Sequence, residues 1–237
     1  MRTLLSLSAL GLALTAASTI AHAQAAHADD GPARTVAGGG IMVPGWMGKV
    51  DATAEKAGQT VKDSKLAANG KTLQVTTGPA ITYWNPANKA SGNYTVSATF
   101  NEPKYMNLNS HPHPYGIMIA GNGMGTADES DLYCAAYGNG KFIVRGFGPA
   151  PFQLNGRGEE NAAVHKAPAV GEPVSQKIAL RVTADKVECV INDTVVGSYA
   201  KSDVVSAGKL TSTDGVYGIR FAHNTDATVS DLKLTKQ

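Results

Sequence analysis

Apolar and polar positions alternate with a period of two over most of the chain after residue 70, which is the pattern of half-buried β-strands. The clearest run is 94–100, where four apolar residues alternate with Thr95, Ser97 and Thr99. Shorter runs of the same kind predict further strands at 73–75, 80–84, 115–120, 132–137, 142–147, 178–182, 187–191, 195–199, 217–221 and 229–234. No segment has a convincing long helical pattern. The chain is therefore predicted to be an all-β, two-sheet antiparallel sandwich.

Turn signals separate these strands. Gly138-Asn139-Gly140-Lys141 and Asn192-Asp193 hold residues that tolerate positive φ, so each predicts a tight hairpin. Residues 148–174 contain four prolines and few apolar pairs, and they predict one long surface excursion. Loops of that length are uncommon inside a compact domain and are often functional.

The first residues predict export. A basic start at Arg2 and an apolar stretch at 4–20 precede Ala21-His22-Ala23, a small-x-small cleavage pattern that recurs at Ala26-His27-Ala28. We expect a signal peptide at 1–23, with the cut after residue 23 or after residue 28, and an exported protein, periplasmic or extracellular. A membrane anchor is the alternative, but the apolar run is short for one. A flexible leader is expected at 24–45 and one domain at 46–237, with no membrane span in the mature protein.

Charge excludes one class of partner. Cleavage removes Arg2 and leaves 20 basic residues against 19 acidic ones, a net charge of +1, with no basic run. A near-neutral chain of this kind is not expected to bind nucleic acid. The two cysteines, Cys134 and Cys189, lie in apolar alternating runs. Export permits a disulfide between them, but reduced buried cysteines fit the same pattern, so both states stay open.

The C-terminal half resembles a known superfamily. The strand Lys177-Ile178-Ala179-Leu180-Arg181-Val182 leads into a second strand and the turn Asn192-Asp193, and residues 214–221 and 231–234 look like a closing strand pair. This pattern is similar to the concanavalin A-like lectin and glucanase superfamily, especially its 3-keto-disaccharide hydrolase-like and laminin-G-like branches. The resemblance implies a jelly roll and a carbohydrate partner. Asp193 replaces the usual glycine, and the stretch 132–137 lacks the acid that many hydrolase members carry.

The most unusual motif is Asn109-Ser110-His111-Pro112-His113-Pro114. The prolines favour an extended backbone, in which residues two apart face the same way. His111 and His113 are thus expected to present two imidazoles together. They could ligate a divalent metal, serve as an acid–base pair, contact a ligand with Asn109, or be structural. Asp128, Glu129, Asp131, His165 and His223 are candidates for a third metal ligand. A divalent metal is the one cofactor that the sequence leaves open.

Aromatic and amide side chains predict a sugar-binding face. Sugars offer apolar C–H faces and fixed hydroxyls, which aromatic rings, amides and arginine match. In the run 132–137, Leu132, Cys134 and Ala136 fit a core face and Tyr133 and Tyr137 the opposite face. The proposed glycan contacts, which we place on a concave sheet face, are Tyr133, Tyr137, Arg145, Tyr115, Asn109, His111 and His113.

Three function classes remain at this stage. Binding of a carbohydrate leads, because amides and aromatics are plentiful. A hydrolase is the second class, with His111, His113 and Asp131 as its candidate catalytic residues, although the pair of carboxylates that glycoside hydrolysis needs is not evident as a motif. A non-catalytic envelope or matrix scaffold is the third.

Overall fold

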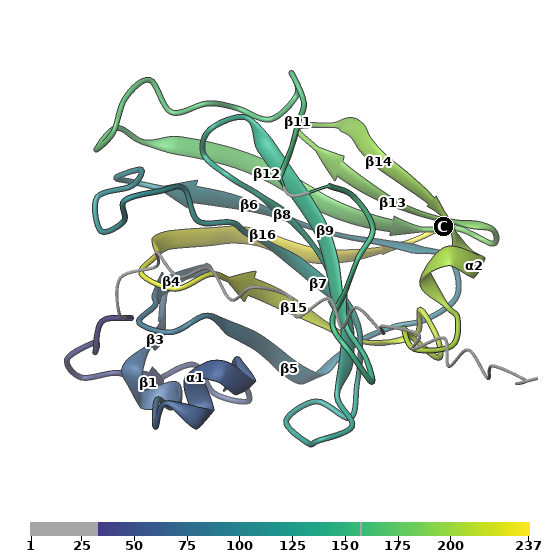
Figure 1. Cartoon of the computed structure of the whole chain (residues 1–237), viewed down its shortest axis with the longest axis horizontal. Helices are drawn as coiled ribbons and strands as arrows, with labels where there is room; N and C mark the ends of the chain where they lie inside the picture. Colours follow the sequence, from purple (N-terminus) through teal and green to yellow (C-terminus); the bar gives the residue numbers. More distant parts are fainter. Residues whose placement is uncertain (1–32, 157) are drawn as a thin grey trace, which may run out of the picture.

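The computed structural model describes residues 33–156 and 158–237, which form two stacked and mainly antiparallel sheets (Figure 1). Sheet A consists, in spatial order, of β1 (Gly40–Ile41), β3 (Lys65–Asn69), β4 (Thr72–Thr76), β16 (Asp226–Lys236), β6 (Tyr94–Glu102), β12 (Val174–Val182), β13 (Lys186–Ile191) and β14 (Thr194–Ala200). Sheet B consists of β10 (Phe152–Gln153), β9 (Lys141–Phe147), β8 (Ser130–Ala136), β7 (Tyr115–Asn122), β15 (Gly215–Phe221), β5 (Ile81–Ala90) and β2 (Met47–Val50), and β11 (Glu159–Glu160) pairs with β9.

Helical structure is confined to short segments in the described residues. These are α1 (Ala52–Lys56), a 3-10 turn η1 (Val61–Asp63) and α2 (Lys201–Val204). In Figure 1, α1 lies at one side of the sandwich near β3 and β5, and α2 lies at the other side beside β13 and β14. The predicted all-β two-sheet sandwich is confirmed.

The strands that the alternation predicted are present, and further strands join them. β2 and β3 precede residue 70, and β1 lies inside the range assigned to the leader, where it pairs in parallel with β3. Near it, the Arg34 guanidinium forms an ion pair of 2.6 Å with Asp226 on β16. The long excursion after residue 147 turns back twice to pair with β9, through β10 and β11.

The core lies between the two sheets, and β8 shows how the sequence determines it. Leu132, Cys134 and Ala136 point into this core and are fully buried. Tyr133 and Ala135 point to the opposite side and belong to a separate apolar cluster. The predicted division of this strand into a core face and a second face is confirmed. We call the side of sheet B that carries Tyr133 and Ala135 the outer face.

One disulfide connects the two sheets. Cys134 on β8 and Cys189 on β13 are bonded, with their Cα atoms 5.8 Å apart. The pairing that the sequence left open is therefore present in this structure.

The hairpin between β13 and β14 shows the predicted turn chemistry. Asn192 and Asp193 both have positive φ, 49° and 66°, as a two-residue turn that follows the twist of its strands requires. Within the described residues, no helix is long and apolar enough to cross a membrane. The signal peptide predicted at 1–23 lies outside the described residues.

Candidate functional site

The candidate site lies on the outer face of sheet B, which carries aromatic and charged side chains. Strand register places Trp84, Gly218, Met118, Tyr133 and Arg145 in one row across β5, β15, β7, β8 and β9. Trp84, Met118 and Tyr133 pack together there with Ala135 and Ile143, and Tyr137 and Phe147 lie at the margin of this cluster. The face thus has an apolar floor with aromatic rings beside it.

Arg220 organises the polar part of this face. Its guanidinium binds both carboxylate oxygens of Asp51, at 2.5 and 2.6 Å, and donates to Thr82 Oγ1 at 3.2 Å. The same group lies 5.4 Å from the ring centres of Tyr133 and Phe147. A bidentate ion pair that also contacts two rings holds a cation in a fixed position, because the planar guanidinium satisfies both geometries at once.

Asp131 is a buried acid on the same face. It sits on β8 opposite Phe147 and is 2% exposed, and its Oδ1 atom has no hydrogen-bond partner among the described residues. Burial raises the pKa of Asp131 to about 7, against the opposing attraction of the Arg220 guanidinium. The strand predicted at 132–137 begins one residue after Asp131, whereas in the structure Asp131 lies within β8.

A hollow of about 370 Å³ is lined by Phe147 and by Asp51 and Thr82, the two partners of Arg220. We call it the acidic hollow, because three carboxylate residues line it. Its principal lining residues are Lys49, Asp51, Glu55, Thr82, Glu129 and Phe147. Lys49 forms an ion pair of 3.2 Å with Glu129 and donates to the Thr126 carbonyl at 3.0 Å. The hollow therefore combines hydrogen-bond acceptors, a fixed ammonium group and one aromatic ring, and its volume falls within the range of ligand pockets.

The predicted sugar contacts are divided between this face and the core. Tyr133 and Arg145 are cross-strand neighbours on the outer face, and Tyr137 lies at its margin. Tyr133 is only 5% exposed, so its side chain packs beneath the surface and offers little area to a ligand. Burial raises the pKa of Tyr137 to about 12. Tyr115 corrects the sequence prediction: it is fully buried between the sheets, because it begins β7 on the core side, and its ring cannot meet a surface ligand.

The histidines of the HPHP motif do come together, at the end of sheet B where β7 begins and β15 ends. His111 Nε2 and His113 Nε2 are 3.0 Å apart, and the ring centre of His223 is 3.9 Å from that of His113. His113 Nδ1 donates to the His223 carbonyl at 2.6 Å, and nearby Asn109 Nδ2 donates to the Asn224 carbonyl. In the described part of the chain, no group of three or more His, Cys, Asp or Glu is arranged to hold a metal ion. The catalytic, metal and ligand roles of His111 and His113 stay predictions.

Sequence reasoning missed the residues that define the hollow. Lys49 and Asp51 lie in a polar stretch that reads as a loop, and Arg220 lies inside an otherwise apolar strand. Their juxtaposition depends on pairing of β2 and β15 with β5, strands that are distant in sequence. The only sequence signal was Arg220 itself, a charged residue in a strand that is apolar on its other face.

Comparison with protein-family models found no match, and comparison with curated protein sequences found none either. Solved structures do match. The carbohydrate-binding module CBM66 from Bacillus subtilis aligns with a TM-score of 0.54 at 10% identity, over 83% of this chain and 99% of the module. An endo-β-1,3-glucanase from Pyrococcus furiosus aligns with a TM-score of 0.55 at 12% identity, over 84% of this chain and 91% of the enzyme.

A third structure, a galectin-like protein of unknown function from Bacillus subtilis, aligns with a TM-score of 0.51 at 12% identity, over 81% of this chain and 89% of that protein. The structural similarity establishes the fold, but at identities this low it does not establish a shared function, which has to be argued from the site. The narrower likeness to the 3-keto-disaccharide hydrolase-like and laminin-G-like branches stays a prediction. With its two stacked sheets in this order, the chain has the concanavalin A-like jelly-roll fold.

Proposed function

We propose that this protein is an exported glycan-binding domain that holds an uncharged or amino-sugar glycan in the acidic hollow on the outer face of sheet B. The observation that carries the proposal is the composition of the hollow, where carboxylates and a lysine line the same hollow as Phe147. Carboxylate oxygens accept hydrogen bonds from sugar hydroxyls, and the ring offers an apolar surface to a C–H face. The glycan-related neighbours of the same fold support a carbohydrate ligand.

The charge of the hollow selects among glycans. Asp51 is paired with Arg220 and Glu129 with Lys49, which leaves the carboxylate of Glu55 in excess. A uronate or sulfate group would add like charge to this site, whereas a hydroxyl or a sugar ammonium group would not. We therefore expect neutral and amino-sugar glycans to be preferred over anionic glycans of similar length.

Export is part of the proposal and has its own support. The disulfide between Cys134 and Cys189 fits an oxidising compartment such as the periplasm or the medium. The near-neutral charge of the chain fits a carbohydrate partner better than a nucleic acid.

Replacement of Phe147 tests the proposed site. Phe147→Ala removes the ring from the hollow and should weaken glycan affinity about tenfold, because a stacked ring contributes through both its area and its electrostatics. Tyr199→Ala is the matched control, since Tyr199 is a similarly half-buried aromatic residue on β14 of sheet A. A glycan array first identifies the ligand, and calorimetry with that glycan then compares the variants.

The array also separates the remaining hypotheses. Run with and without a divalent metal, it tests whether His111 and His113 take part through a metal, and analysis of the glycans afterwards detects cleavage. Binding that Phe147→Ala leaves unchanged, or that only anionic glycans show, would refute the acidic hollow as the site. Tyr137→Ala extends the test along the face, where weaker binding with unchanged thermal unfolding would add Tyr137 to the site.

A further inference from the structure

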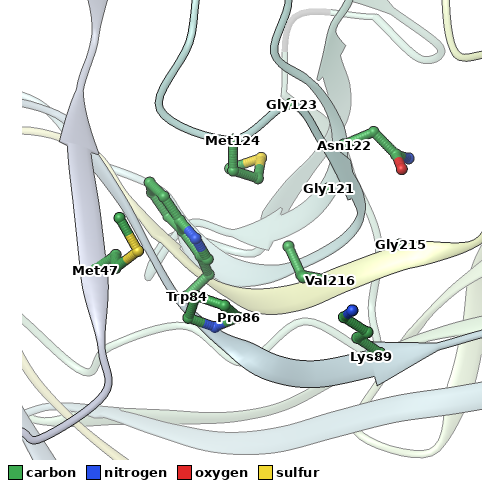
Figure 2. Close-up of a pocket in the computed structure, with 10 residues that line it drawn as sticks. All are labelled: Met47, Trp84, Pro86, Lys89, Gly121, Asn122, Gly123, Met124, Gly215 and Val216. Atoms are coloured by element: carbon green, nitrogen blue, oxygen red, sulfur yellow. The ribbon is translucent and has the colours of Figure 1, made fainter.

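A second cavity, of about 390 Å³, lies on the outer face and differs in chemistry from the acidic hollow. Figure 2 shows Met47, Met124 and Val216 around Trp84, with Lys89 and Asn122 on the far side from Met47. We call it the thioether pocket. Of its lining residues, Lys89 alone carries a charge.

Local backbone irregularities shape this pocket. The pairing of β7 with β8 shifts register between Ile119 and Asn122, and the pairing of β15 with β5 and β7 shifts between Val216 and Gly218. At the first of these bulges Ala120 has a φ of 57°, a conformation that costs a non-glycine residue energy. Bulges re-aim side chains and are common beside functional sites. Here they open a recess at the Asn122 end of β7, away from the histidines at its start.

The lining fits a flexible alkyl chain better than a sugar ring. A sugar stacks on an exposed aromatic face, but Trp84 is only 2% exposed. Met47 is 48% exposed, and Met124 also borders the opening, so unbranched thioether side chains form the accessible surface. Methionine adapts its shape to irregular apolar ligands because its chain has several rotatable bonds and a polarizable sulfur.

We propose that the thioether pocket binds a free medium-chain fatty acid, with its alkyl chain along Met47, Met124 and Val216, close to the buried Trp84, and its carboxylate beside Lys89. The choice of a carboxylate follows from charge complementarity: the pocket presents one ammonium group and no acid. This site is separate from the acidic hollow and does not depend on the glycan proposal.

Trp84 reports binding directly. The chain has two tryptophans, so in a Trp46→Phe variant the tryptophan fluorescence, excited selectively over that of tyrosine, comes from Trp84 alone. Titration with hexanoate, octanoate and decanoate, each below the concentration at which it forms micelles, should give a saturable change in emission. Affinity should rise about fourfold for each methylene that the pocket buries, until the pocket is full. Calorimetry on the unmodified protein measures the same affinities without a change in sequence.

Charge variants give the decisive comparison. Lys89→Gln should weaken decanoate binding by up to about fivefold, the upper end of what an exposed ion pair contributes. Met47→Glu, at an exposed position that tolerates a polar side chain, should weaken it further by repelling the carboxylate, whereas Met47→Lys should not weaken it. Lys186→Gln on sheet A is the control for non-specific attraction.

The proposal is refuted if decanoate shows no saturable binding, if decylammonium binds as tightly as decanoate, or if Met47→Glu and Met47→Lys bind decanoate equally. Circular dichroism of each variant establishes that it is folded. Unchanged glycan binding by Met47→Glu would show in addition that the two sites on the outer face are distinct.

Discussion

Reduction of the disulfide between Cys134 and Cys189 should lower the free energy of unfolding by about 4 kcal/mol. The bond closes a segment with a sequence separation of 55 residues, and a loop of that length loses considerable entropy in the unfolded chain when its ends are joined. Because the bond also links β8 in sheet B with β13 in sheet A, its loss removes the one disulfide cross-link between the sheets in the described residues.

Urea unfolding of the oxidised protein and of the protein kept in excess reductant measures this difference with identical side chains. The double variant Cys134→Ala, Cys189→Ala is the control, and its stability should not respond to reductant. Equal midpoints for the oxidised and reduced wild-type protein would show that the bond contributes nothing to stability. A reductant effect on the double variant would show that the reagent acts elsewhere.

The alternation of side chains explains why most of the sandwich could be predicted. Along β6 and β8 successive side chains point alternately into the core and away from it. The apolar residues Val96 and Leu132 therefore show which side of each strand faces the core, without any knowledge of the partner strand. The hairpin at Asn192-Asp193 could be predicted for the same reason, since its turn depends only on the φ values of two adjacent residues. Local patterns fix strands and tight turns, and these suffice for the fold class.

Sites that depend on pairing between distant strands could not be predicted from the sequence. The contact between Asp51 and Arg220 joins residues 169 positions apart, and no local pattern encodes it. Tyr115 shows a different error, in which the local sequence gave the wrong prediction. Its neighbours in the sequence are the histidines and prolines of a surface motif, but it begins a strand, and the strand's period places it in the core.

Stability should fall as the pH rises from about 4 to about 7, because two buried carboxyl groups hold protons in the folded state. Burial raises the pKa of Asp131 to about 7, and burial raises the pKa of Glu102, the last residue of β6, to about 7 as well. In the unfolded chain both groups ionise near pH 4. Between these values the folded protein carries protons that the unfolded protein has released, so raising the pH favours unfolding, and the loss is complete above pH 7.

A rise of about three pKa units at 1.36 kcal/mol per unit gives a loss of about 4 kcal/mol for each group across this window. The isosteric variants Asp131→Asn and Glu102→Gln cannot ionise, so each should flatten the curve of unfolding free energy against pH and should be more stable than the wild-type protein at pH 8. Glu172→Gln, at an exposed loop position, is the control and should leave the curve unchanged. Urea unfolding at intervals between pH 4 and pH 8 measures all four proteins. If the wild-type protein gains stability across this range, the buried acids ionise on folding, and Arg220 then holds Asp131 as a carboxylate instead of an acid.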